Sequence, residues 1–268
     1  MELDGKVALI TGAGHGIGAA MAHRFAQEGA AGLFLVDLDG PAVDALASEL
    51  TTAGTPTAAQ TVDVADPDAV REMVASAQAR FGAVDVLCSN AGIGTAQGLD
   101  ADAATWDRSW SVNVLAHVHA AEAAIPGMVE RGGGYVVATC SAAGLLTMVG
   151  DAPYSVTKHA AVAFAEWLAV TYGPQGVRVS ALCPQGVATA LLDGGDGGNS
   201  LSSRIVRSAA EVLQPEDVAQ SVIDGMAEER FLILPHAQVA EHYRKKAADP
   251  DRWIGAMQRF AAAIEDGG

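Results

Sequence analysis

The sequence has little positive charge and no long apolar run. It contains 16 Lys and Arg residues against 32 Asp and Glu residues, so its formal net charge is -16. Proteins that bind a nucleic-acid backbone need clustered Lys and Arg side chains to displace counterions, so this excess of acid argues against a nucleic-acid partner. No stretch approaches the roughly 20 consecutive apolar residues that a transmembrane helix needs. We therefore expect no membrane partner either.

Cysteine is also scarce. Cys88, Cys140 and Cys183 are far apart, and each lies at the end of a β-like run. This odd number and wide spacing predict reduced, packed thiols rather than a disulfide framework or a metal site. His117 and His119 are two residues apart on a predicted helix and do not face one another, so we expect no metal there. The N-terminus lacks the basic region and cleavage site of a secretory signal, so we expect a cytoplasmic protein.

Short aliphatic or β-branched runs alternate with Ala-rich amphipathic segments of helical length. Half of the residues are hydrophobic, which favours a packed globular fold over disorder. Seven runs predict strands, and they begin at Lys6, Leu33, Thr57, Val84, Tyr135, Val177 and Phe231. Strands that are apolar on both faces and separated by helices are typical of a parallel sheet covered on each side. The sequence therefore predicts an α/β fold, a single doubly wound domain over residues 1–268 with about seven parallel strands.

Two segments depart from this alternation. Residues 190–214 are rich in Gly, Asp and Ser, which predicts a flexible substrate-binding loop able to order over a ligand. A linker between domains is the alternative, but a helical pattern and a final strand follow, which favours an excursion within one domain. Residues 236–265 predict a helical C-terminal extension. This extension could cover either its own active site or a neighbouring subunit.

A glycine-rich turn follows the first predicted strand. Gly12, Gly14, Gly16 and Gly18 lie where this strand turns into a helix. Glycine permits a positive φ and lets backbone N–H groups approach an anion, and the helix N-terminus adds a favourable dipole. The turn predicts a pyrophosphate site. Glycines also mark ordinary close packing, so the turn alone is a weak signal.

An acidic residue at the end of the second predicted strand strengthens this interpretation. Asp37 lies about 20 residues after the glycines, where a carboxylate can hydrogen-bond the ribose of a dinucleotide. Asp37 could instead be an ordinary turn residue, but the order of strand, glycines, helix, strand and acid favours the nucleotide. Its charge would repel the 2′-phosphate of NADP. Because Leu38 follows it and the glycine loop carries His15 rather than Lys or Arg, we predict NAD in preference to NADP.

These motifs together resemble those of the short-chain dehydrogenase/reductase family, from Met1 to about Thr189. The run "TGAGHGIG" is similar to the family's TGxxxGIG turn, "NAG" at Asn90–Gly92 to its motif after the fourth strand, and "YSVTK" to its YxxxK pair. Several motifs in the right order are far more specific than any one of them. The resemblance implies a Rossmann fold and a nicotinamide cofactor, as in the ordinary short form of the family.

The resemblance also implies which residues bind that cofactor. They are Thr11, Gly12, Gly14, His15, Gly16, Ile17, Gly18, Asp37, Leu38, Asp63, Val64, Asn90, Ala91, Gly92, Tyr154, Lys158, Pro184, Gly186, Val187 and Thr189. One position departs from the family pattern, which usually has Pro-Gly after the sixth strand. Here Gln185 stands between Pro184 and Gly186, so the local backbone path can differ while the fold remains the same.

A catalytic set of Asn113, Ser141, Tyr154 and Lys158 is likewise implied by the resemblance. Residues four apart on a helix lie on one face, so Tyr154 and Lys158 can address the same cleft. A phenol with a reference pKa of roughly 10 is a poor base at neutral pH. We expect the Lys158 ammonium and the positive nicotinamide ring of the oxidised cofactor to lower the pKa of Tyr154, which then exchanges the substrate proton. Ser141 would hydrogen-bond the substrate oxygen, and Asn113 would anchor a water that relays protons to Lys158.

Apolar residues around this set predict the substrate class. The candidate substrate residues are Ser141, Leu145, Leu146, Met148, Val149, Leu191 and Leu192. Their apolar side chains favour a hydrophobic secondary alcohol or ketone over a charged sugar or acid, although they could instead pack in the core. The resemblance implies a homodimer or homotetramer, paired through the helices predicted over residues 105–131 and 154–173.

The leading functional prediction is an NAD-dependent oxidoreductase that interconverts a hydrophobic secondary alcohol and its ketone. A catalytically silent, nucleotide-binding regulatory protein on the same fold is the alternative. The intact set of Asn113, Ser141, Tyr154 and Lys158 argues against it. A lyase or epimerase is a third reading, but the short C-terminal portion leaves little room for a nucleotide-sugar domain.

Overall fold

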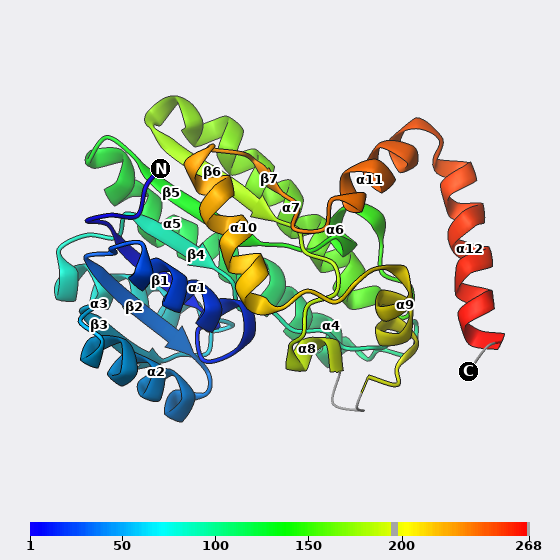
Figure 1. The fold of residues 1–268 in the computed structure, drawn as a ribbon, viewed down its shortest axis with the longest axis horizontal. Coiled ribbons are helices and arrows are strands. Elements are labelled where there is room, and N and C mark those ends of the chain that lie inside the picture. Colours follow the sequence, from blue (N-terminus) through cyan, green and yellow to red (C-terminus); the bar gives the residue numbers. More distant parts are fainter. Residues whose placement is uncertain (194–197, 267–268) are drawn as a thin grey trace.

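The computed structural model describes residues 1–193 and 198–266, and its centre is a seven-stranded, all-parallel sheet (Figure 1). Its strands are β1 (Val7–Thr11), β2 (Gly32–Asp37), β3 (Thr57–Thr61), β4 (Val86–Ser89), β5 (Gly134–Thr139), β6 (Val177–Leu182) and β7 (Leu232–Ile233). The spatial order is β3-β2-β1-β4-β5-β6-β7. The chain first adds strands on one side of β1 and then, from β4 onward, on its other side. This confirms the predicted doubly wound α/β fold and places a crevice at the β1/β4 switch point.

Helices cover both faces of this sheet. One face packs against α3 (Pro67–Phe81), α5 (Ala116–Glu130) and α7 (Ala152–Tyr172), and the other against α1 (Gly16–Gln27), α2 (Gly40–Thr52) and α10 (Pro215–Ala227). Along β1, Leu9 faces the first layer while Ala8 and Ile10 face the second. Because both faces of the central strands β1, β2, β4, β5 and β6 are buried, these strands are nearly continuous apolar runs in the sequence, which is why the sequence revealed them.

Aspartates begin several of the helices. The side chain of Asp39 accepts from the N–H of Ala42 at the start of α2, and Asp66 does the same for the first turn of α3. Asp102 caps α4 (Ala103–Trp110), which continues through a π-helical segment, Ser111–Leu115, into α5. A carboxylate at this position satisfies backbone donors that have no partner inside the helix, and it complements the helix dipole.

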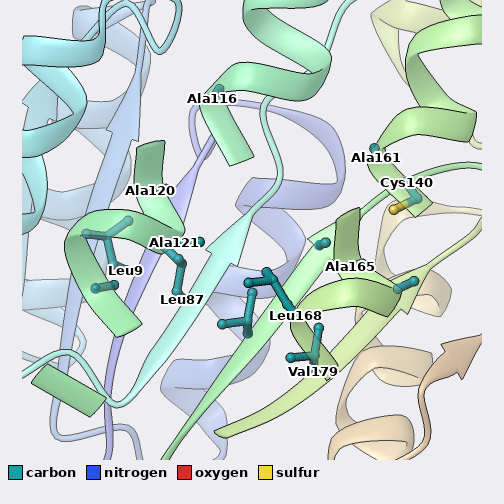
Figure 2. Close-up of a cluster of buried hydrophobic side chains, with 14 of the residues drawn as sticks. Leu9, Leu87, Ala116, Ala120, Ala121, Cys140, Ala161, Ala165, Leu168 and Val179 are labelled. Atoms are coloured by element: carbon teal, nitrogen blue, oxygen red, sulfur yellow. The ribbon is translucent and has the colours of Figure 1, made fainter. Parts of the chain in front are cut away.

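Small side chains bring α5 and α7 close to the sheet. Figure 2 shows Ala120 and Ala121 of α5 and Ala165 of α7 above the strand side chains Leu87 and Val179. These alanines are almost completely buried. The space between helix and sheet is therefore filled by methyl groups, and packing at interior density leaves no room for larger ones.

The part of the chain after β6 is more helical than the sequence indicated. Residues 190–214, expected as a flexible loop, contain α8 (Ala190–Asp193) and α9 (Leu201–Ala209), while 194–197 lie outside the described residues. Ser200 caps α9 by accepting from the N–H of Ser203, a start signal that the glycine-rich run concealed. The chain ends in α11 (Gln238–Ala248) and α12 (Pro250–Asp266), which lie at one edge of the molecule (Figure 1). No helix in the described ranges is long and apolar enough to span a membrane.

The packing of α7 predicts how the core responds to added volume. We expect Ala165→Leu to lower the free energy of unfolding by about 1–3 kcal/mol, because the extra atoms must displace neighbouring side chains. Ala75→Leu, at an exposed position of α3 away from the helices expected to pair with another subunit, is the control and should leave stability nearly unchanged. Urea unfolding followed by circular dichroism measures both. Equal effects of the two substitutions would contradict the packing described.

Candidate active site

A cleft of about 580 Å³ opens at the switch point of the sheet, beyond the carboxyl ends of the strands. Most of the predicted cofactor residues line it: Gly12, His15, Gly16, Ile17, Asp37, Leu38, Asp63, Val64, Asn90, Ala91, Gly92, Tyr154, Lys158, Pro184, Val187 and Thr189. Gly14, Gly18 and Gly186 do not line it, and Thr11 lies beneath its floor as a hydrogen-bond acceptor. The strand ends thus gather residues that are more than 150 positions apart in the chain.

Two glycines of the turn after β1 have backbone conformations that other residues rarely adopt. Gly12 and Gly16 have φ angles of 64° and 52°, and a Cβ on Gly16 would lie 2.9 Å from Cγ2 of Thr189. A Cβ on Gly18 would overlap the carbonyl oxygen of Gly12. Gly18 therefore serves helix packing, while Gly12 and Gly16 leave backbone facing the cleft. No side chain caps the first turn of α1, so its N–H groups remain suited to an anionic ligand.

Asp37 holds the glycine turn from the neighbouring strand. Its Oδ2 accepts from the N–H of Gly14 at 2.8 Å, and its Oδ1 accepts from the N–H of Asp39 at 3.0 Å. Asp39 in turn contacts Nε2 of His15 at 3.0 Å, and this hydrogen bond holds the pKa of Asp39 below its usual value. The His15 imidazole of the turn therefore already faces a carboxylate.

Arg108 is a residue of the cleft that the sequence did not single out. Its Nη1 donates to Oδ2 of Asp63 at 2.8 Å, and this bond lowers the pKa of the Asp63 carboxyl. Both side chains line the cleft. Arg108 lies on α4, 45 positions from Asp63, and no local motif marks the pair.

The floor of the cleft is a hydrogen-bonded network that joins three strand ends. Thr11 Oγ1 at the end of β1 accepts from the N–H groups of Asn90 at 2.9 Å and Ala91 at 3.1 Å. The Asn90 amide donates to the carbonyl of Thr11 at 3.0 Å, and its Oδ1 accepts from Thr139 Oγ1 at 3.0 Å. This network fixes the spacing of β1, β4 and β5 where the cleft opens.

Three members of the predicted catalytic set, Ser141, Tyr154 and Lys158, line the cleft together. Lys158 Nζ donates to the carbonyl of Thr139 at 2.9 Å and lies 5.7 Å from the centre of the Tyr154 ring. The Ser141 side chain is close enough to the Tyr154 phenol to lower its pKa. A small molecule whose oxygen meets Tyr154 would therefore meet Ser141 as well.

The residues of the protein alone do not give Tyr154 the lowered pKa that we expect with Lys158 and an oxidised cofactor. Burial raises the pKa of Tyr154 to about 12, and the carboxylate of Asp151 raises it further, whereas the hydrogen bond from Ser141 lowers it. Burial also lowers the pKa of Lys158. The loss of hydration disfavours the phenolate more strongly than the hydrogen bond from Ser141 favours it. The protein by itself therefore keeps the phenol neutral and does not lower its pKa.

Asn113 lies outside the cleft. It is completely buried in the π-helical segment, where its Oδ1 accepts from the N–H of Ile93 at 2.9 Å. Its Nδ2 donates to the carbonyl of Ile93 at 2.9 Å and to Thr157 Oγ1 at 3.1 Å. The side chain thus joins the segment after β4 to α7. The water that Asn113 was expected to anchor stays a prediction.

Asp151 is a second residue that the sequence analysis missed. This carboxylate is only 5% exposed and accepts four hydrogen bonds. Oδ1 accepts from the N–H of Tyr154 at 3.0 Å and from Thr95 Oγ1 at 2.7 Å, and Oδ2 accepts from the N–H groups of Thr95 and Ala96, each at 2.7 Å. Asp151 thereby caps α7 and fixes the loop that lines the cleft opposite Tyr154. The sequence "DAP" at the start of a helical run is a cap signal that could have revealed half of this role.

His236 supports the position where the chain departs from the family pattern. Its Nδ1 accepts from the N–H of Gln185 at 3.1 Å, so Nε2 carries the proton and donates to the carbonyls of Gly186 at 3.1 Å and Glu211 at 3.2 Å. The ring is buried, and this burial lowers its pKa. The neutral ring holds the backbone between β6 and α8.

The predicted substrate residues divide between the cleft and an adjoining cavity. Ser141, Met148, Leu191 and Leu192 line the cleft, and Ser141, Leu146, Met148 and Val149 line a second cavity of about 290 Å³. Leu145 lines neither space. It lies on α6 (Ala143–Leu146) and its side chain is buried in the core, so its assignment to the substrate wall was wrong. Consecutive residues of a helix point about 100° apart, which sends Leu145 inward and Leu146 to the cavity.

Comparison with known proteins places this arrangement among dehydrogenases. The family model for short chain dehydrogenases matches residues 6–195. The 1-deoxy-11-beta-hydroxypentalenate dehydrogenase of Streptomyces exfoliatus is 34% identical over 263 residues, which covers 95% of this chain and 91% of that protein.

Two solved structures are similar over most of their length. A short chain dehydrogenase/reductase from Burkholderia phymatum in complex with NAD has a TM-score of 0.86 at 31% identity, covering 94% of this chain and 96% of that chain. The L-sorbose reductase of Gluconobacter frateurii, complexed with NADPH and L-sorbose, has a TM-score of 0.77 at 29% identity, covering 87% and 97%.

Proposed function

The chain belongs to the short-chain dehydrogenase family and is an oxidoreductase, and on that premise we propose that it interconverts a hydrophobic secondary alcohol and its ketone with NAD. Tyr154 is the proposed general acid and base. The observation that carries this proposal is the convergence of Tyr154, Ser141 and Lys158 on the same cleft as the glycine turn and Asp37. The name of the Streptomyces exfoliatus relative, a dehydrogenase of a hydroxy compound, supports an alcohol as the substrate.

The residues around the glycine turn fit a nicotinamide dinucleotide. Gly12 and Gly16 would receive the pyrophosphate at the uncapped N-terminus of α1, and Asp37 would accept hydrogen bonds from the adenosine ribose. When bound, the cofactor supplies the acceptor for a hydride in oxidation or its donor in reduction. Val187 and Thr189 also line the cleft and are suited to contact the nicotinamide.

The charges of the cleft favour NAD over NADP. The carboxylate of Asp37 would repel a 2′-phosphate, while His15 faces Asp39 and Arg108 faces Asp63. The Lys and Arg side chains that line the cleft among the described residues are Arg108 and Lys158, and both already have partners. Because the two solved relatives contain NAD in one case and NADPH in the other, this preference rests on the charges of this chain.

The proton chemistry follows from the burial of Tyr154. A phenol with a pKa of about 12 is protonated at neutral pH and is ready to donate to the oxygen of a ketone. Ser141 would hold that oxygen, and Lys158 would stabilise the phenolate that remains. Oxidation needs the phenolate first, so the pKa of Tyr154 must fall when a positively charged, oxidised cofactor is bound.

Exposed apolar side chains support the proposal of a homodimer or homotetramer. Trp167 and Val170 on α7 are 54% and 74% exposed, and Trp110 at the end of α4 is 41% exposed. Large apolar side chains on neighbouring helices are typical of surfaces that pair with another subunit.

Replacing the phenol tests the proposed role of Tyr154 directly. We expect Tyr154→Phe to lose at least about a hundredfold in turnover, because proton transfer by a positioned side chain contributes factors of this size. Binding of NAD, measured by calorimetry, should persist. Tyr172→Phe at the far end of the same helix is the matched control and should keep the parent rate. The absorbance of the reduced cofactor measures the rate of each variant. A Tyr154→Phe enzyme as fast as the parent would contradict the mechanism.

Removal of the acidic charge tests cofactor choice. We expect Asp37→Ala to weaken NAD binding about tenfold or more, because the hydrogen bonding of the carboxylate to the adenosine ribose is lost. The preference for NAD over NADP should also decrease, because the carboxylate no longer repels the 2′-phosphate. Asp44→Ala makes the same change in net charge at an exposed position of α2 and should alter neither affinity. Calorimetric titration with each cofactor gives the ratio. An unchanged ratio in Asp37→Ala would show that another group selects the cofactor.

A further inference from the structure

The second cavity continues the cleft beyond the reacting groups. Ser141, Met148, Gln185 and Val206 line both spaces, so the two are contiguous. Ser141 thus lies at the junction, with Tyr154 on the cleft side. A substrate whose oxygen is held at Ser141 can extend away from the cofactor turn into this cavity of about 290 Å³.

The side chains around the second cavity are mostly apolar. They come from four separate parts of the chain and include Leu146, Met148, Ile205, Trp253, Met257 and Phe260. No Asp, Glu, Lys or Arg of the described ranges lines it, although the chain carries a net charge of -16. Its polar lining groups include His242 and Gln185. Because no Asp, Glu, Lys or Arg side chain of the described residues lines it, the cavity favours uncharged apolar groups over charged ones.

The C-terminal helices hold an apolar face over this cavity without filling it. Trp253, Met257 and Phe260 are spaced four and three residues apart, which places them on one face of α12. All three line the cavity, yet none is buried. An apolar face left in contact with water is a source of binding free energy for an apolar ligand.

Specific contacts keep these helices in place. Arg204 on α9 donates to the carbonyl of Ile264 near the end of α12, which lies beside α9 at the edge of the molecule (Figure 1). Lys246 on α11 donates to the carbonyl of Leu145 at 2.7 Å and contacts Nε2 of His159 on α7 at 3.4 Å. The cavity is therefore bounded on its outer side by an anchored wall rather than a free tail.

We propose that this cavity is a second substrate subsite, which binds a bulky, uncharged hydrocarbon group attached to the carbinol carbon. The inference rests on the proposed function, because it takes the substrate oxygen to lie between Ser141 and Tyr154. It narrows the substrate class from any hydrophobic secondary alcohol to one with a ring system or a branched skeleton. Trp253 and Phe260 are the residues that determine this preference.

Two alcohols of different size test the subsite. We expect the parent enzyme to oxidise decalol, a fused bicyclic secondary alcohol, with a kcat/KM at least about tenfold above that for isopropanol. In Trp253→Ala and Phe260→Ala, kcat/KM for decalol should fall about tenfold while that for isopropanol stays unchanged. Ile254→Ala, on the exposed face of the same helix, is the matched control and should change neither value. Thermal melting by circular dichroism verifies that each variant is folded.

Binding without turnover separates this inference from the proposed function. Calorimetric titration of the NAD-saturated protein with decalone should show binding that is weakened about tenfold in Phe260→Ala and unchanged in Ile254→Ala. If neither alcohol is oxidised, the proposed function fails, and the calorimetry alone decides the subsite. Decalone binding that is absent, or equal in both variants, overturns the subsite. So does an equal loss for both alcohols in Trp253→Ala and Phe260→Ala.

Discussion

The hydrogen bonds at the carboxyl ends of β1, β4 and β5 are the interaction on which the rest of the site depends. Thr11 and Thr139 both bind Asn90, so three adjacent strands are fixed to one another where the cleft opens. The carbonyl of the same Thr139 accepts from Lys158, which also sets the position of that ammonium. Gly12 lies so close to Ala91 that a Cβ would come within 2.9 Å of its Cα. The cofactor turn and the Tyr154–Lys158 pair are thus positioned by a shared set of strand ends.

Burial decides the chemistry of this arrangement. The same close packing that orients Tyr154 removes it from water, and this desolvation outweighs the hydrogen bond from Ser141. The protein alone thus prepares an acid, and a base appears only when further positive charge enters the cleft. Asp151 adds to this effect, because the carboxylate that caps α7 and holds the loop at Thr95 and Ala96 also disfavours the phenolate.

The fold was readable from the sequence because its information is local. The central strands are buried on both faces and appear as apolar runs, whereas the edge strand β3 is only partly buried. The glycine turn, Asp37 and the YxxxK pair carry their chemistry within short segments. The residues that were missed act over long separations. Asp151 meets Thr95 56 positions away, and His236 meets Gln185 51 positions away. The inward orientation of Leu145 and the direction of the Tyr154 pKa depend on burial, which no local pattern encodes.

The pH dependence of alcohol oxidation with NAD shows whether the ionisation of the Tyr154 phenol controls the reaction. We expect a kcat/KM that rises with pH along a single ionisation. Because the Asp151 carboxylate raises the pKa of Tyr154, Asp151→Asn should move that ionisation to lower pH. A rate that is independent of pH, or an ionisation at the same pH in Asp151→Asn, would contradict the account.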